Sequence, residues 1–256
     1  MVGSPSRSSR WLLIVAVIAV GLTLRSTIAA IPPVLEAISF DLNLDGATAG
    51  LLTSLPVLCF AIGSSLVTLA THRIRTNPLI LLSLLVLAIA VAVRPWGGTF
   101  LLLAGTAVMG LAITVGNVLL PTVVRRDFPR HIGPMTAVTS STLNIGAAIT
   151  AALTVPMAVW LGGWRGANAS WALLGVVAAG LWVIAARHTA PDTPAPAHVG
   201  TISAVWRSGD AWWLGAFFGL QSALYYTTTQ WLPSILQDAA TLSRELAGTG
   251  LSLYQL

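Results

Sequence analysis

Long apolar stretches separated by short polar ones form the main pattern of this chain. A helix of about 20 apolar residues crosses a hydrocarbon core of about 30 Å. Seven such stretches are predicted to be membrane-spanning helices, at 11–36, 47–69, 77–94, 99–121, 134–161, 168–186 and 210–232. An eighth starts near Ala247, but its ten residues would rise only about 15 Å, so we expect the chain to be a fragment or a truncated product.

The longest polar connection divides these helices into two sets. Residues 187–209 are rich in proline and alanine and are predicted to form a cytoplasmic linker. Residues 1–186 are then expected to form a six-helix bundle. Residues 210–256 would begin a second bundle with helix seven and part of helix eight. The predicted fold class is an all-α polytopic membrane protein.

A weak internal repeat agrees with two such halves. A shift of 200 residues aligns PPVLEAISFDLNLDGATAGL with LPSILQDAATLSRELAGTGL and pairs Pro33 with Pro233. The same shift pairs Asn43 with Ser243, which we expect to be the N-caps of helices two and eight. Parallel repeats of this kind are typical of transporters.

The composition indicates a membrane protein. The chain is 55% hydrophobic and 8% charged, whereas soluble domains carry about 25% charged residues. Its 13 cationic residues are all arginines, and they fall mostly between the apolar stretches. The positive charge therefore indicates membrane topology, and we expect no nucleic acid as a partner.

Arginines are distributed unequally between alternate connections. If the N-terminus is cytoplasmic, the inside group is Arg7, Arg10, Arg73, Arg75, Arg125, Arg126, Arg130, Arg187 and Arg207. The outside group is Arg94, Arg165 and Arg244. This bias predicts a multi-pass membrane protein with a cytoplasmic N-terminus. We expect it to lie in the bacterial inner membrane. A signal peptide ending near Ala29 and Ala30 is the alternative interpretation of the first stretch.

One arginine interrupts the first stretch. Arg25 lies fifteen residues beyond Arg10, about 22 Å along a helix, where a charge costs about 2.5–3.5 kcal/mol. Pro32 and Pro33 are expected to weaken the helix above it, as beside a binding cavity. We expect Arg25 to bind an anionic substrate. The alternatives are an ion pair with a carboxylate from another helix and an error in the predicted depth.

Other polar residues lie along the faces of later helices. Besides Arg25, the candidate substrate-binding residues are Asn117, Asn144, Gln221 and Tyr225. We expect their helix faces to point toward the same interior. The alternative for each is packing or an interhelical hydrogen bond, which is the commoner use of such residues in membranes.

The sequence contains no pattern typical of a metal, cofactor or catalytic site. Cys59 is the only cysteine, and the four histidines are scattered between the spans without ligand spacing. No serine–histidine or acid–histidine arrangement is visible. We expect no cofactor, no metal and no enzymatic activity.

Five segments together indicate a known family. They are LRSTIAAIPPVLEAI, GATAGLLTSLPVLCF, GNVLLPTVVRRDFP, GGWRGANASWALL and GLQSALYYTTTQWLPSILQD. In this order the chain resembles the major facilitator superfamily and, more narrowly, its cyanate/2-nitroimidazole transporter family. The resemblance implies twelve helices in two halves around a central cavity. It also implies alternating access, with small anions or nitro-heterocycles among the substrates.

The chain departs from the family pattern at several positions. Ser26 follows Arg25, where the family often has proline. The loop LATHRIRTNP keeps Arg73 and Arg75 but lacks the usual acid, and the resemblance makes these two arginines candidates for a gating loop. Thr106 stands where proton-coupled members often have arginine, and NIGAAITAALTVPMA lacks the Gly-Pro signature of drug antiporters.

These features predict a secondary or facilitative transporter of a small anionic or polar solute, cyanate-like or nitro-heterocycle-like. Its expected partners are that solute and the lipid bilayer, with a coupling proton as a further candidate. The alternatives are a drug-efflux transporter of the same fold and an inactive truncated fragment.

Overall fold

A computed structural model describes residues 7–71, 74–187, 207–240 and 243–255. Within these ranges the chain forms helices and no strand, which confirms the all-α class. In chain order the elements are α1 (Arg7–Ala29), the 3₁₀ turn η1 (Pro32–Val34), α2 (Leu35–Leu42), α3 (Gly46–Thr71), α4 (Thr76–Val93), the 3₁₀ turn η2 (Arg94–Trp96), α5 (Gly98–Asp127), α6 (Ile132–Trp160), α7 (Trp164–Ser170), α8 (Ala172–Ala186), α10 (Gly209–Ala240) and α11 (Arg244–Gln255).

Six segments of the described chain are long and apolar enough to cross a membrane. They are Arg10–Leu42, Gly46–Thr71, Thr76–Trp96, Gly98–Asp127, Ile132–Trp160 and Trp164–Ala186. Each corresponds to one of the first six predicted spans. The seventh predicted span is also helical, as part of α10, but it does not belong to this set because tryptophan, tyrosine and Gln221 lower its mean hydropathy.

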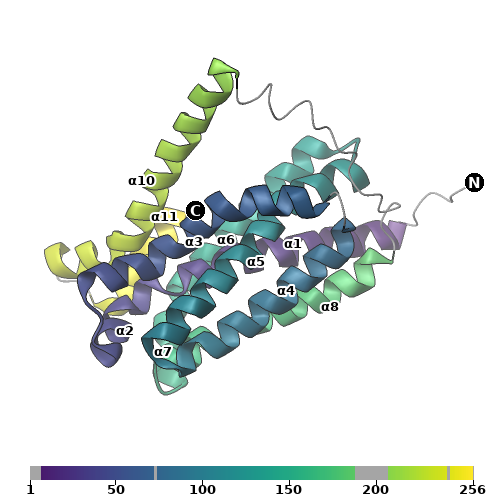
Figure 1. The fold of residues 1–256 in the computed structure, drawn as a ribbon. Coiled ribbons are helices and arrows are strands. Elements are labelled where there is room, and N and C mark those ends of the chain that lie inside the picture. Colours follow the sequence, from purple (N-terminus) through teal and green to yellow (C-terminus); the bar gives the residue numbers. More distant parts are fainter. Residues whose placement is uncertain (1–6, 72–73, 188–206, 241–242, 256) are drawn as a thin grey trace, which may run out of the picture.

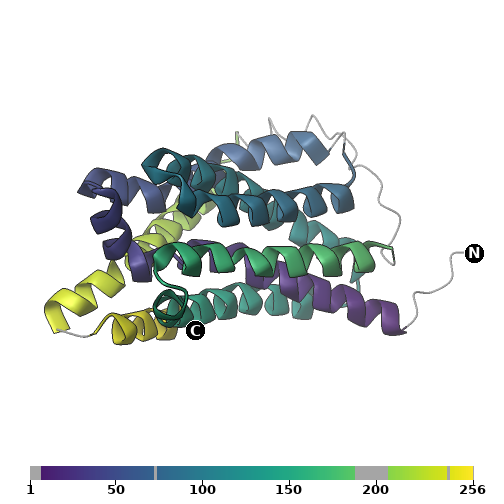
Figure 2. The same ribbon diagram turned by 90° about the horizontal axis from the view of Figure 1, so that it is seen from below.

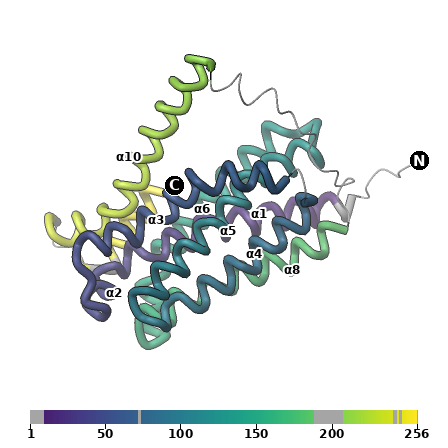
Figure 3. The backbone as a smooth tube through the Cα atoms, in the orientation of Figure 1, coloured from purple at the N-terminus to yellow at the C-terminus, as the bar shows by residue number. Residues whose placement is uncertain are grey.

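The long helices pack side by side (Figure 1 and Figure 2). α1 lies between α6 and α8, α4 lies between α5 and α8, and α3 packs on α5. α11 packs on α6, and α10 meets α11 and η1 at the bundle end opposite the start of α1. From there α10 runs away from the bundle (Figure 3), so its residues 212–224 are exposed.

Small residues bring α1 and α6 close together. A Cβ atom added at Gly146 of α6 would lie 2.5 Å from the carbonyl oxygen of Leu22 in α1. Gly21 of α1 packs in the same way against Thr142 of α6. Membrane helices associate through such close packing because lipid offers no hydrophobic driving force between them. The contact also sets the register that places Arg25 opposite α6.

The double proline ends α1. The α-helix stops at Ala29, and Pro32 starts the short 3₁₀ turn η1 before α2 continues. Proline lacks the N–H group that would extend the helix, and its ring clashes with the preceding turn. The predicted weakening of the helix above Arg25 is therefore confirmed.

The two predicted N-caps have different outcomes. Asn43 does not cap α3: it ends α2 in the left-handed conformation, with φ 52°, which asparagine tolerates. Asp45 takes the cap position instead and accepts the backbone N–H of Thr48 at 2.9 Å. Hydrogen bonds from the side chain and backbone of Thr48 lower the pKa of Asp45. Ser243 accepts the N–H of Leu246 at 3.4 Å, so the predicted cap of α11 is confirmed.

Candidate functional site

Arg25 on α1 makes contacts with α6 and with α10. Its Nη1 donates a hydrogen bond to Oδ1 of Asn144 at 2.9 Å. Its Cζ lies 4.4 Å from the centre of the Tyr225 ring. The structure therefore brings three of the five substrate-binding candidates together from three different helices.

Both of these partners of Arg25 are neutral. Among the described residues, no carboxylate forms an ion pair with Arg25. An aromatic face stabilises a guanidinium by about 0.5–2 kcal/mol, but it does not cancel the charge. The alternative of a structural ion pair finds no support in the described part of the chain. The half-buried site keeps a positive charge.

Tyr225 belongs to an aromatic and amide cluster that holds its ring in place. Its ring packs edge-on against Tyr226 at 5.2 Å and stacks on Tyr254 at 6.1 Å between centroids. Its hydroxyl donates to Oε1 of Gln255. Nε2 of Gln255 in turn donates to Oγ1 of Thr229 at 3.2 Å. Contacts between α10 and α11 thus fix the ring that covers the guanidinium.

A small cavity of about 20 Å³ lies against Tyr226. Its walls come from α1, η1, α3, η2, α5 and α10, and most of them are apolar. The lining residues are Ile28, Ile31, Pro32, Leu52, Thr53, Pro56, Arg94, Thr106, Met109, Tyr226, Thr229 and Gln230. This cavity therefore adjoins the tyrosine pair and contains a second arginine.

The sequence analysis was wrong about Arg94, which it assigned to an outside loop. The side chain is 1% exposed and extends into the bundle. Its Nη1 donates to Oγ1 of Thr106 at 3.4 Å and to Sδ of Met109 at 3.1 Å. Its Nη2 donates to the carbonyl oxygen of Thr27 at 3.2 Å and to Oδ1 of Asn168 at 3.3 Å. These acceptors on three elements explain why the side chain turns inward.

Asn117 and Gln221 do not hydrogen-bond to Arg25. Asn117 is exposed and lines another cavity of about 120 Å³. The other residues lining it are Leu120, Pro121, Val124, Thr136, Thr139, Ser140 and Leu143. Gln221 is exposed on the first part of α10. The substrate-binding roles of these two residues stay predictions.

The gating-loop candidates belong to the connection before α4. Arg73 lies outside the described residues. Arg75 is exposed and precedes α4 with an extended backbone, φ −64° and ψ 146°. The gating role of both residues stays a prediction.

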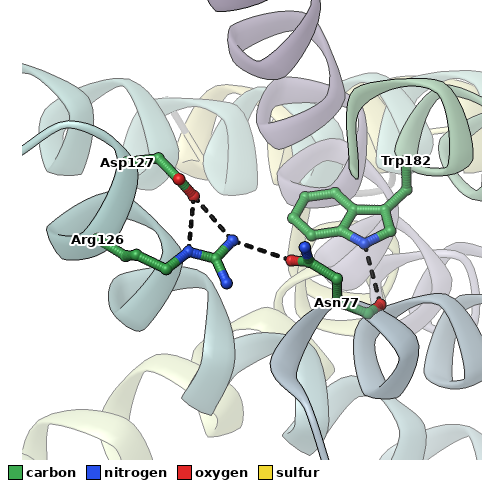
Figure 4. Close-up of polar contacts among 4 residues, drawn as sticks. All are labelled: Asn77, Arg126, Asp127 and Trp182. Atoms are coloured by element: carbon green, nitrogen blue, oxygen red, sulfur yellow. Dashed lines mark hydrogen bonds and ion pairs between the residues drawn. The ribbon is translucent and has the colours of Figure 1, made fainter. Parts of the chain in front are cut away.

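A polar cluster at this end ties α4, α5 and α8 together (Figure 4). Nε and Nη2 of Arg126 donate to Oδ2 of Asp127 at 3.1 and 2.8 Å. The same Nη2 donates to Oδ1 of Asn77 at 2.9 Å, and Nε1 of Trp182 donates to the carbonyl oxygen of Asn77 at 3.1 Å. This arginine has a carboxylate partner, in contrast to Arg25.

One family accounts for this arrangement of helices. The model of the Major Facilitator Superfamily matches residues 11–256. The chain belongs to this superfamily. The predicted family is therefore confirmed, and the six apolar segments make this chain a multi-pass membrane protein.

Three relatives within the superfamily have transporter names. The chain is 35% identical over 244 residues to the uncharacterized transporter YycB of Bacillus subtilis (strain 168), covering 95% of this chain and 60% of the relative. It is 35% identical over 256 residues to the 2-nitroimidazole transporter of Escherichia coli (strain K12), covering 99% and 64%. It is 26% identical over 252 residues to the cyanate transport protein CynX of the same organism, covering 95% and 63%. The narrower resemblance is confirmed, although the chain spans less than two thirds of each relative.

Solved transporters share the fold. A bacterial homologue of the human lysosomal transporter Spinster superposes with a TM-score of 0.78 at 14% identity, covering 98% of this chain and 59% of that protein. A D-xylose–proton symporter superposes with a TM-score of 0.72 at 14% identity, covering 96% and 65%. At this identity the likeness confirms the predicted fold. The family and its transporter-named members also support a transport protein rather than an enzyme.

Arg94 is the residue of this region that the sequence analysis missed. It directly follows a long apolar run and precedes Pro95, a pattern typical of a loop. No signal in the sequence points to it, and the structural reason is at Gly105, where a Cβ atom would lie 2.5 Å from Cβ of Arg94. A glycine in the neighbouring helix thus leaves room for the inward turn of the arginine.

Proposed function

We propose that this protein is a secondary transporter that moves a small anionic or polar solute across the membrane, with Arg25 binding the charged end of the solute. The observation that carries the proposal is the half-buried guanidinium with an amide oxygen and an aromatic ring as its partners. The bond to Asn144 uses one of the five N–H groups of the guanidinium. Others are then available for an anion.

The placement of the site supports alternating access. α1 and α6 belong to the first predicted half, residues 1–186, whereas α10 follows the predicted linker, residues 187–209, and belongs to residues 210–256. A solute held between halves can be released on either side when one half rocks against the other. Such a site must bind with similar strength in both states, because a large difference would trap the solute. We also propose that Arg73 and Arg75 act at the gate and that Asn117 and Gln221 line the solute path.

The chemistry of the site favours a flat solute with a delocalised charge or a polar nitro group. A guanidinium donates in its own plane, and the Tyr225 ring beside it offers a π face. The names of two relatives, a 2-nitroimidazole transporter and a cyanate transport protein, agree with this class. We propose a cyanate-like anion or a nitro-heterocycle as the solute, with a coupling proton as a candidate partner.

Drug efflux is a weaker candidate function. It would favour a wide apolar cavity with a titrating carboxylate. The residues that line the two described cavities include no aspartate or glutamate. A lining without carboxylates in these two cavities agrees with a solute that itself carries the negative charge.

We also propose that the protein lies in the bacterial inner membrane with a cytoplasmic N-terminus. The buried side chain of Arg94 no longer counts in the outside group, which keeps Arg165 and Arg244. The excess of arginine on the N-terminal side therefore becomes larger, and this excess sets orientation.

Uptake of labelled cyanate and 2-nitroimidazole into proteoliposomes tests the role of Arg25. We expect Arg25→Ala to lower uptake at least about tenfold, because a lost charged hydrogen bond weakens binding by about 1.5–3 kcal/mol. Arg25→Lys should keep part of the activity, since it keeps the charge but not the planar fork. Arg125→Ala, at an exposed arginine near the end of α5, is the matched control. Wild-type uptake in both Arg25 variants would remove this residue from the mechanism.

A further inference from the structure

Arg94 is a buried cation whose partners are all neutral. The side chain is 1% exposed, and its four hydrogen-bond partners are a hydroxyl, a thioether, a carbonyl and an amide oxygen. Among the described residues, no carboxylate forms an ion pair with it. Burying a charge without a counter-charge is strongly unfavourable, so such residues in membranes mark functional sites.

Two buried donors in the same cavity have no acceptor. Nε of Arg94 and Nε2 of Gln230 are both buried and form no hydrogen bond with the described residues. Gln230 itself is 7% exposed. Both residues line the small cavity of about 20 Å³ beside Tyr226. Buried donors are nearly always satisfied in folded proteins, so two orphan donors on residues that line one cavity indicate an absent acceptor.

The remaining walls define what kind of acceptor fits. They are formed by apolar side chains, by the ring of Tyr226 and by the hydroxyls of Thr53, Thr106 and Thr229. No acidic residue lines the cavity. The hydroxyls of Thr53 and Thr106 already donate to the backbone carbonyls of Gly50 and Leu102. A single positive charge with an amide donor in a largely apolar, confined space suits a small anion of charge minus one. A doubly charged anion would leave one charge unpaired.

We propose that this cavity is a second anion-binding site, in which Arg94 and Gln230 bind a small monovalent anion. The anion would accept from Nε of Arg94 and from Nε2 of Gln230, and thus satisfy both orphan donors. Contact between the rings of Tyr225 and Tyr226 separates this site from the guanidinium of Arg25. The inference concerns equilibrium binding and does not depend on transport or on Arg25.

Nitrate titration of the purified protein in detergent, at constant ionic strength with gluconate as the replacement anion, tests the site. Binding is followed by calorimetry and by the nitrate-dependent rise in Tm. We expect Arg94→Gln to weaken nitrate binding at one site at least about tenfold and to remove most of the Tm rise. Arg25→Gln should leave that site intact. Arg125→Gln, at an exposed arginine, controls for the loss of one charge.

Gln230→Leu separates binding from a purely structural role. Leucine removes the orphan amide, so without nitrate we expect an unchanged or higher Tm. With nitrate we expect a smaller Tm rise than in the wild type. If Arg94→Gln fails to fold, the nitrate-dependent rise in Tm is measured in Gln230→Leu and Arg94→Lys instead. That rise then decides whether the cavity binds nitrate.

Three results would overturn the proposal. One is a wild-type protein whose Tm and calorimetric signal do not respond to nitrate. Another is a nitrate response that is unchanged in folded Arg94 and Gln230 variants. The third is a response that disappears in Arg25→Gln alone, which would assign the anion to the first site. Loss of transport in Arg25 variants with intact nitrate binding would support both proposals, since the two readouts are independent.

Discussion

Arginines at the ends of the bundle and arginines inside it have different partners. Arg126 and Arg165 each form an ion pair with an aspartate. Arg25 and Arg94 instead contact amide, hydroxyl, carbonyl, thioether and aromatic groups. A carboxylate in an ion pair neutralises the charge of the arginine. Neutral partners orient the guanidinium but leave its charge without a counter-charge. This difference agrees with the proposal that the interior arginines bind ligands.

Giving the interior arginine Arg25 a carboxylate partner, like the aspartates that pair with Arg126 and Arg165, tests this difference. Asn144→Asp places a carboxylate where Nη1 of Arg25 now donates to an amide oxygen at 2.9 Å. We expect KM for an anionic solute to rise about tenfold or more, because the new ion pair competes with the solute. Uptake kinetics in proteoliposomes measure this effect. Asn43→Asp, at an exposed asparagine, is the control and should match the wild type. An unchanged KM in Asn144→Asp would contradict the role of Arg25.

The next prediction tests the close packing of α1 against α6. Gly146→Ala forces a Cβ atom to within 2.5 Å of the Leu22 carbonyl oxygen unless the helices separate. We expect a loss of about 1–3 kcal/mol in stability, as for other overpacked interiors. Thermal unfolding in detergent measures it. The control is Gly180→Ala on α8, where nothing lies within 4 Å of the new atom, and a Tm equal to that of this control would contradict the expectation.

Removing the aromatic ring beside Arg25 should lower solute affinity by a smaller factor. Tyr225→Leu removes the ring that lies 4.4 Å from Cζ of Arg25. A cation–π contact is worth about 0.5–2 kcal/mol, so we expect solute affinity to fall about two- to thirtyfold. Tyr225→Phe keeps the ring and should retain most of the affinity, although it loses the hydrogen bond to Gln255. Equal losses in both variants would assign the effect to the hydroxyl instead.

Breaking the ion pair of an end arginine should have the smallest effect on stability. Arg165 pairs with Asp41, and the two side chains are 35% and 39% exposed. Exposed ion pairs contribute about 0–1 kcal/mol and are screened by salt. We therefore expect Asp41→Asn to lower Tm only slightly, with a smaller difference at high ionic strength, and to leave solute uptake unchanged. A large loss of uptake would show that the end arginines are not merely structural.

Much of the site near Arg25 could be predicted from the sequence. The position of Arg25 in the first apolar stretch and the double proline above it are local features, and the double proline led to the correct prediction of the helix break. The depth of Arg25 in the membrane stays a prediction. The contact with Asn144 and Tyr225 was predicted only as a shared interior, because the sequence does not show how helices rotate about their axes. Asn117 and Gln221 followed from the same polar pattern, yet the structure leaves both exposed and without a hydrogen bond to Arg25.

Two errors have a common cause. Asn43 and Arg94 both stand at the ends of apolar runs, where sequence patterns favour caps and loops. Asn43 instead ends the short helix α2, whose existence depends on the break at Pro32. Arg94 turns inward because acceptors from other helices, such as Thr27 and Asn168, lie within reach. Neither outcome depends on neighbouring residues alone.

By itself, the sequence determined the class of the protein, the order of its spans and the presence of a charged residue within the first of them. These properties follow from hydropathy and span length, since a helix in lipid satisfies its own backbone hydrogen bonds whatever its neighbours are. Only the tertiary structure decided which polar groups meet. Close packing at Gly21 and Gly146 sets one helix against another, and contacts far apart in the chain bury Arg94 in the wall of a cavity that Gln230 also lines. Those distances depend on the packing of several helices at once, which a linear pattern does not specify.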